Sequence, residues 1–309
     1  MKILLTGASG FIGRNFLELA PKDIEITGIY NSSKDIVDFA KNKKLNNVRL
    51  YKCDLTNEEE TKQLFGRIGK EVDYCLYLAA NVNVPLSKEN PAEDFGQTAV
   101  TLINFLQNCN KIKRFVYLSS AAVYDGNKGF VGTDAKLNPT VPYCISKLAA
   151  EQYVKFFSSM GKIVEYVIIR FGGAFGPYSE KKFMTKLVRD VCINNRQEIE
   201  VYGDGTNIIN VMYVKDAFKA LLACLNSKKS NTITNLGQEN LTIKETVERA
   251  AKALGRKVNI KYTPRLEKQK YIDFKIKVDF NEIFNFRPDY SFEEGIREFA
   301  DILKNESKK

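Results

Sequence analysis

Short runs of β-branched and aliphatic residues alternate along the chain with longer segments in which apolar residues recur at helical spacing. The short runs predict strands at Lys2–Thr6, Glu25–Tyr30, Val48–Lys52, Tyr74–Leu78, Arg114–Ser119, Val164–Arg170 and Thr232–Leu236. The longer segments predict helices at Phe11–Ala20, Glu58–Gly69, Pro91–Asn110 and Tyr143–Met160. Such alternation is typical of an α/β protein with a parallel, doubly wound sheet.

The alternation becomes less regular after about Gly172, where helices are predicted at Lys182–Asn195, Val214–Leu225, Ile243–Leu254 and Phe292–Leu303. Three pairs of residues predict capping boxes at helix starts: Thr56/Glu59, Thr242/Glu245 and Ser291/Glu294. We expect a smaller α+β substrate lobe, partly interleaved with the main domain. The main domain is predicted at 1–171 and about 207–240, and the substrate lobe at 172–206 and 241–309, with ligands in the crevice between them.

The chain of 309 residues is basic, with 47 Lys and Arg against 37 Asp and Glu and a formal net charge of +10. This charge favours encounters with anions, including nucleic acids, membrane surfaces and phosphorylated metabolites. The lysines are scattered in short groups such as 41–44, 181–182 and 228–229. We therefore expect a solvated basic surface and no nucleic-acid partner.

Histidine is absent, and the six cysteines include no C-x-x-C pair. We therefore expect no metal site, and Ser-His-Asp and Cys-His catalysis are excluded. Acid–base chemistry then depends on Tyr, Lys, Asp, Glu or Cys.

Nothing in the sequence predicts secretion or membrane insertion. The first residues, MKILLTGASGFIG, are interrupted by three glycines and lack the apolar region of a signal peptide, and no stretch approaches the length of a membrane span. Isolated cysteines are typical of a reducing compartment. We expect a cytoplasmic protein with no membrane partner.

A glycine-rich turn follows the first predicted strand directly, with the sequence TGASGFIG at Thr6–Gly13. Gly7 suits the tight turn, Gly10 a close approach of the backbone to a diphosphate, and Gly13 close packing of helix on strand. Phe11 and Ile12 begin the helix, whose N-terminus attracts the anion. The position of the motif predicts a dinucleotide-binding Rossmann domain.

The end of the second predicted strand bears on the choice of cofactor. An acidic residue usually stands there and binds the adenosine ribose, but this chain has Asn31, Ser32, Ser33 and Lys34. These side chains, with Arg14 across from them, are suited to a 2′-phosphate, so we predict NADP(H), with NAD(H) as the alternative. Asp54, after the third strand, is either an acceptor for the adenine amino group or an ordinary turn residue.

Tyr143 and Lys147 are four residues apart at the start of a predicted helix, so their side chains share one face. A nearby cation stabilises a phenolate, typically lowering its pKa by ~1–3 units, and this makes tyrosine a usable base near neutral pH. The segment Leu118–Tyr124 (LSSAAVY) ends the fifth strand, where ligands bind in open α/β sheets. A serine there can bind the same substrate oxygen as Tyr143.

Further motifs occur in a fixed order: Asp54-Leu55, Leu78-Ala79-Ala80, SSAAVY, YCISK, RFGGAFGP at Arg170–Pro177, GDG at Gly203–Gly205, YVKD at Tyr213–Asp216 and SFEEGI at Ser291–Ile296. With TGASGFIG, they resemble the extended short-chain dehydrogenase/reductases of the nucleotide-sugar (NAD-dependent) epimerase/dehydratase family.

The resemblance implies a role for each matching residue. Ser120 would orient the substrate, Tyr143 would be the general acid/base, and Lys147 would lower its pKa and bind the nicotinamide ribose. Leu55, Leu78, Ala79 and Ala80 would contact the cofactor, and Asn83, Ser120 and Gly173 the nucleotide sugar. The family also implies a homodimer held by a four-helix bundle.

Departures from the family pattern bear on the substrate. Ala121-Ala122 replaces the Asp-Glu of family dehydratases, which disfavours a 4,6-dehydratase. Gly173 replaces a familiar Asn, and Gly172-Gly173 predicts room for a larger sugar. Ile209-Asn210 replaces an Arg-Asp pair, and Lys270 is the candidate to supply the missing positive charge.

The resemblance implies an NAD(P)-dependent oxidoreductase that acts at a sugar carbon, C4, of a nucleotide-activated sugar. The main hypothesis is a 4-keto nucleotide-sugar reductase, because exchangeable NADPH suits net reduction. The alternative is a 4-epimerase with tightly bound NAD, which returns the hydride to the other face of C4. A minor alternative is a non-catalytic dinucleotide-binding protein, disfavoured because Ser120, Tyr143 and Lys147 are all present.

Overall fold

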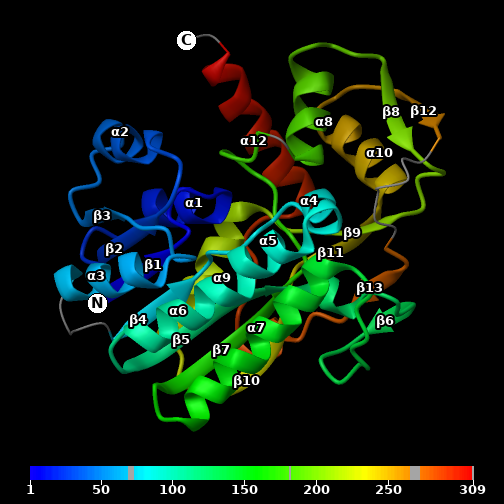
Figure 1. The fold of residues 1–309 in the computed structure, drawn as a ribbon. Helices are drawn as coiled ribbons and strands as arrows, with labels where there is room; N and C mark the ends of the chain where they lie inside the picture. The colour runs from blue at the N-terminus through cyan, green and yellow to red at the C-terminus, as the bar shows by residue number, and fades with distance from the viewer. Residues whose placement is uncertain (69–72, 181, 265–271, 308–309) are drawn as a thin grey trace.

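A computed structural model of the chain describes residues 1–68, 73–180, 182–264 and 272–307. Its centre is a seven-stranded parallel sheet in the order β10-β7-β5-β4-β1-β2-β3 (Figure 1). The strands are β1 (Lys2–Thr6), β2 (Glu25–Tyr30), β3 (Val48–Lys52), β4 (Tyr74–Tyr77), β5 (Ile112–Ser120), β7 (Ile163–Phe171) and β10 (Thr232–Leu236). The predicted doubly wound parallel sheet is confirmed.

Helices cover both faces of the sheet because the strands alternate their apolar side chains between two cores. In β1, Ile3 and Leu5 face one core and Leu4 the other. The first core is covered by α1 (Phe11–Leu19), α2 (Asp35–Asn42), α9 (Val214–Asn226) and α11 (Phe280–Phe284). The second is covered by α3 (Glu58–Ile68), α6 (Thr101–Asn108) and α7 (Pro142–Ser159).

The helix predicted at Pro91–Asn110 is present but contains an irregular turn. It consists of α5 (Pro91–Phe95), the π-helical turn η1 (Gly96–Val100) and α6. Two short helices nearby were not predicted, α4 (Val84–Glu89) and the 3₁₀ turn η2 (Ala121–Tyr124). Both are too short to display a helical period in the sequence.

A third core lies beside the sheet. It is built by the helices α8 (Phe183–Cys192), α10 (Ile243–Ala253) and α12 (Phe292–Glu306) with strands β8 (Glu198–Tyr202), β9 (Ile208–Val211) and β11 (Glu239–Thr242). Strand β12 (Asn259–Thr263) pairs with β8, and β11 pairs with β9. Strand β13 (Phe274–Ile276) pairs with β6 (Gly129–Val131), which joins a late segment to the sheet domain.

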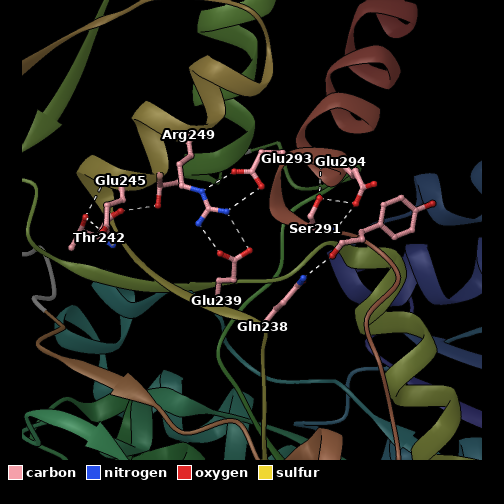
Figure 2. Close-up of polar contacts among 10 residues, drawn as sticks. Gln238, Glu239, Thr242, Glu245, Arg249, Ser291, Glu293 and Glu294 are labelled. Carbon is pink, nitrogen blue, oxygen red and sulfur yellow. Dashed lines mark hydrogen bonds and ion pairs between the residues drawn. The ribbon is translucent and has the colours of Figure 1, made fainter.

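Two of the three predicted capping boxes are confirmed, those of Thr242 with Glu245 and of Ser291 with Glu294 (Figure 2). The box predicted for Thr56 and Glu59 is wrong. Helix α3 is instead capped by Asn57, whose Oδ1 accepts from the N–H of Glu60 at 3.1 Å. Thr56 instead belongs to the preceding turn, where its N–H and its hydroxyl both donate to Asp54 Oδ1, at 2.9 and 2.7 Å.

Arg249 connects three elements of the third core. Its guanidinium lies between the carboxylates of Glu239 and Glu293, with closest N–O distances of 2.6 and 2.8 Å (Figure 2). These bonds tie α10 to β11 and to the first turn of α12.

Within the described ranges, no helix combines the length and apolar character needed to cross a membrane.

Candidate active site

A cavity of about 1590 Å³ follows the carboxyl edge of the sheet and continues to the third core. Its walls include the loop after β1, the ends of β2, β4, β5 and β7, and residues of α7, β8, β9 and β13. In open α/β sheets, ligands bind at this edge, near the point where the strand order reverses. Here β1 and β4 are neighbours at that point.

The glycine-rich turn forms one end of the cavity, and its backbone geometry requires glycine. Gly7 has φ +67°, a conformation that L side chains rarely adopt. A Cβ on Gly13 would lie 2.3 Å from the carbonyl oxygen of Gly7. No side chain caps α1, since Gly10 occupies the cap position. Its N-terminal N–H groups therefore suit an anion, and the cradle fits the diphosphate of a dinucleotide.

Beside this cradle, Leu55, Leu78, Ala79 and Ala80 line the cavity, as do Phe11 and Ile12. The hydroxyl of Thr6 accepts from the N–H groups of Leu78 and Ala79, at 3.0 Å each, and thus joins the ends of β1 and β4. Asp54 also lines the cavity, while its Oδ1 accepts from the N–H and hydroxyl of Thr56 in a turn.

Only some of the predicted phosphate-binding residues around the end of β2 line the cavity. Asn31 and Ser32 line the cavity, whereas Arg14 and Lys34, both described, are not among its lining residues. The Arg14 guanidinium instead donates to Asp35 Oδ2 at 2.7 Å and to the Ser9 carbonyl at 2.9 Å. The carboxylate absent from the strand end is therefore present five residues beyond Tyr30, at the start of α2.

Ser120, Tyr143 and Lys147 meet in the middle of the cavity wall. The hydroxyl of Ser120 accepts from the N–H of Ala122 at 3.1 Å and hydrogen-bonds the phenol of Tyr143. Lys147 is buried, and its Nζ donates to the carbonyl of Leu118 at 3.1 Å. The carboxyl end of β5 and the first turns of α7 thus position all three side chains.

Burial dominates the electrostatics of these groups. It raises the pKa of Tyr143 to about 12, and the hydrogen bond from Ser120 partly opposes this. Burial also lowers the pKa of Lys147 to about 8, against the attraction of Glu151 and Asp94. Tyr143 is therefore a phenol at neutral pH and Lys147 is mostly an ammonium, so the site begins with a proton donor beside a cation.

The predicted substrate residues have separate positions. Gly173 lines the cavity with φ +139°, a backbone conformation that few L residues adopt. The replacement of Asn by Gly at this position therefore affects the backbone as well as the side chain. Asn83 lies outside the cavity lining and caps α4, its Oδ1 accepting from the N–H of Leu86 at 3.1 Å. Lys270 falls outside the described residues.

The space predicted at Gly172 is filled. A Cβ there would lie 2.7 Å from Cβ of Asn210 and 2.8 Å from Cδ1 of Ile276. Asn210 is itself held by the N–H of Gln238, which donates to its Oδ1 at 3.0 Å. The missing side chain at Gly172 therefore accommodates neighbouring protein atoms.

Several cavity residues carry no signal in the sequence. Near Ser120 and Gly172, Phe274 and Ile276 join Ala121 and Ala122, which the sequence did single out, in an apolar wall. Val82 precedes α4, Val84 begins it, and Gln97 belongs to the π-helical turn. On the side of α8, the lining residues include five charged ones: Glu180, Lys182, Lys186, Asp190 and Arg196. The sequence could not identify them, because distant segments bring them to the cavity.

Comparison with known proteins agrees with this geometry. The model of the NAD dependent epimerase/dehydratase family matches residues 3–237. A Methanocaldococcus jannaschii protein, provisionally assigned as a UDP-glucose 4-epimerase, is 29% identical over 318 residues, with 99% of each chain covered.

Solved structures resemble the whole fold. Thermotoga maritima UDP-glucose 4-epimerase, crystallised with UDP-glucose, has a TM-score of 0.87 at 23% identity and covers 99% of this chain and 100% of its own. Bacillus cereus UDP-glucuronic acid 4-epimerase, in complex with UDP-glucuronic acid and NAD, has a TM-score of 0.85 at 21% identity, with 99% of each chain covered.

Proposed function

The chain belongs to the NAD dependent epimerase/dehydratase family, and from this premise we propose that it is a 4-epimerase of a nucleotide-activated sugar that retains NAD. The observation that carries the proposal is the meeting of Ser120, Tyr143 and Lys147 between the glycine cradle and the open part of the cavity. The sequence favours a 4-keto reductase, with the epimerase as the alternative. The epimerases among the similar proteins support that alternative.

The surroundings of Arg14 support NAD rather than the predicted NADP. A 2′-phosphate would need a free cation, but the Arg14 guanidinium is paired with the carboxylate of Asp35. Asp35 would also repel a second anion placed beside it. Asn31 and Ser32 remain at the cavity wall as neutral partners for the ribose hydroxyls.

The proposed chemistry is a reversible proton transfer at one sugar hydroxyl. When bound, NAD supplies the acceptor and then the donor of a hydride at the same carbon. Tyr143 first gives up its phenolic proton to solvent. As the phenolate it takes the hydroxyl proton and later returns it, while Ser120 holds the same oxygen by a hydrogen bond. Lys147 would hold the nicotinamide ribose, while the hydrogen bond from Ser120 favours the Tyr143 phenolate. Because both proton and hydride return, no net oxidation occurs.

We also propose that the third core and its helices form the substrate lobe, with the division of the chain as predicted from the sequence. Cavity residues of α8, β8 and β9 would then face the nucleotide, and the apolar wall of Ala121, Phe274 and Ile276 would face the sugar. The apolar wall offers packing surface rather than hydrogen bonds to sugar hydroxyls.

A homodimer is proposed on the basis of an apolar surface on α7 and its neighbours. Ile145, Tyr153 and Phe156 of α7 are exposed, as are Met160 just after it and Phe95 of α5. Exposed apolar patches on helix faces favour helix–helix association. A second copy of the chain would cover this surface in a four-helix bundle.

The function is tested by two measurements on the purified protein. The nucleotide released by gentle denaturation is identified by mass spectrometry, and UDP-glucose and UDP-glucuronic acid are incubated separately with the protein without added cofactor. We expect bound NAD and conversion of one of these sugars to its C4 epimer. An empty site, preference for NADPH and reduction of a 4-keto nucleotide sugar without epimer formation would favour the reductase instead.

A further inference from the structure

A buried ion pair lies beneath the catalytic side chains. Glu151 of α7 and Arg170 of β7 are 0% and 2% exposed. The Arg170 guanidinium donates to both oxygens of Glu151, with a closest distance of 2.9 Å. Removing charges from water costs several kcal/mol per ion, so a buried pair is not explained by stability alone.

Glu151 also contacts the strand that carries the catalytic serine. The hydroxyl of Ser119 donates to Glu151 Oε1 at 2.6 Å. Ser119 precedes Ser120 directly and is itself a cavity residue. Through this bond, the carboxylate fixes the end of β5 against α7, between which Tyr143 and Lys147 lie.

The spacing along α7 brings the carboxylate to Lys147. Tyr143, Lys147 and Glu151 follow one another at intervals of four residues, so they lie on the same helix face. The Nζ of Lys147 donates to the carbonyl of Leu118. A neutral carbonyl does not balance the charge of a buried ammonium.

We propose that Glu151 is a positioning residue of the active site, which keeps Lys147 in its charged form and holds Ser119 next to Ser120. Arg170 in turn holds the Glu151 carboxylate in place through its hydrogen bonds to both oxygens. This inference rests on the proposed role of Lys147 in holding the nicotinamide ribose.

Other groups surround Lys147 and must be included. Asp94 approaches from α5 and is fixed by Asn81 and Ser146, each at 2.6 Å. The ring of Tyr117 from β5 lies with its centroid 5.3 Å from the Lys147 Nζ. Burial lowers the pKa of Lys147, while Glu151 and Asp94 raise it, Glu151 more strongly. Loss of the Glu151 charge therefore favours the neutral amine.

The test measures NADH binding against pH by fluorescence, after removal of bound nucleotide. In the natural protein, affinity should weaken as the pH rises through about 8, where Lys147 loses its proton. The E151Q variant keeps the shape but not the charge. Its weakening should begin about one pH unit lower, while its affinity at pH 6 should stay within about twofold of the natural value, since Lys147 is charged there.

Two further variants make the test specific. Glu165 pairs with Arg114 across the same strands, β5 and β7, at the opposite end, so E165Q is the matched control and should bind like the natural protein at every pH. If E151Q does not fold, E151Q/R170Q removes both charges and leaves no unpaired ion. It should also show a downward shift, because the Glu151 carboxylate, which raises the pKa of Lys147, is absent from both variants.

Three outcomes would overturn the inference. They are an unchanged pH dependence in the variant lacking Glu151, a loss of affinity that is equal at all pH values, and a natural protein whose NADH affinity shows no decline near pH 8. The binding measurement does not depend on which sugar reaction the protein catalyses. A reductase would therefore overturn the proposed function and leave this result intact.

Discussion

At Tyr143, burial and hydrogen bonding act in opposite directions. Burial raises the pKa of Tyr143 to about 12, and the Ser120 hydroxyl lowers it. The sequence predicts that Lys147 makes Tyr143 more acidic, but Lys147 is not among the groups that shift it here. The Lys147 Nζ is directed to the carbonyl of Leu118 instead. We infer that Ser120 is the closer electrostatic partner of the phenol.

Replacement of Tyr143 by Phe should therefore remove catalysis and leave the cofactor site intact. We expect kcat to fall roughly 10²–10⁴-fold, the contribution typical of a positioned acid/base, with NADH affinity nearly unchanged. Lys147→Ala should lower both kcat and the affinity for NADH. Steady-state kinetics and fluorescence titration check this, and more than a few per cent of residual turnover in Tyr143→Phe would contradict the mechanism.

The Arg14–Asp35 pair predicts how cofactor preference can be altered. Asp35→Asn should improve NADPH affinity roughly two- to fivefold, because Arg14 loses its competing carboxylate, which is 70% exposed and thus a weak partner. NADH affinity should change little. Titration with both cofactors measures this, with Arg14→Ala/Asp35→Asn as the control. A similar gain in the double variant would show that Arg14 is not the phosphate partner.

At the scale of elements, irregular segments build much of the cavity wall. The π-helical turn η1 contributes Gly96 and Gln97, and the 3₁₀ turn η2 begins with Ala121 and Ala122. A π-helical turn has a wider backbone than the α-helix around it and is frequent at functional sites. The seven strands of the parallel sheet and the longer helices were predicted, whereas these turns were not, because four or five residues are too few to show a repeating pattern.

The close contact between α1 and the glycine-rich turn gives a prediction at this scale. Gly13→Ala should destabilise the protein by about 1–3 kcal/mol and weaken NADH binding, because its Cβ would overlap the carbonyls of Gly7 and Ala8. Gly66→Ala in α3 is the matched control, since nothing lies within 4 Å of its Cβ. It should stabilise α3 by up to about 1 kcal/mol. Thermal melts and NADH titration distinguish the two, and equal effects would contradict the argument.

At the scale of the whole molecule, late segments of the chain return to the sheet domain. Phe280 and Phe286 pack in the first core, with Phe16 of α1 and Leu221 of α9. Asp279 accepts from the Thr234 hydroxyl and the Asn235 N–H, which fixes the segment before α11 to β10. The segment 279–286 therefore joins the sheet domain to the third core, in addition to the chain near Gly172, and the cavity lies between these two parts.

The apolar surface of α7 predicts the oligomeric state. We expect the natural protein to be a dimer and Phe156→Glu to be a monomer with its fold retained, because a buried charge would oppose association. Phe130→Glu, at an exposed position on β6, is the control and should remain dimeric. Analytical ultracentrifugation measures this. A monomeric natural protein, or a dimeric Phe156→Glu variant, would place the interface elsewhere or exclude it.

The amino-acid sequence by itself determined the parallel sheet, its major helices, the glycine cradle and the spacing of Tyr143 and Lys147. These features are local: each depends on periodicity, on a turn that requires glycine, or on residues one helical turn apart. Where a local choice was close, as at Thr56 and Asn57, the prediction failed by one residue.

Only the tertiary structure decided which distant groups meet. Asp35 pairs with Arg14, Asn210 fills the space over Gly172, and Glu151 reaches both Ser119 and Arg170. It also decided the direction of the pKa shifts at Tyr143 and Lys147, since desolvation depends on every segment packed around a group. A sequence pattern records intervals along one segment, whereas burial and charge pairing arise from the packing of many.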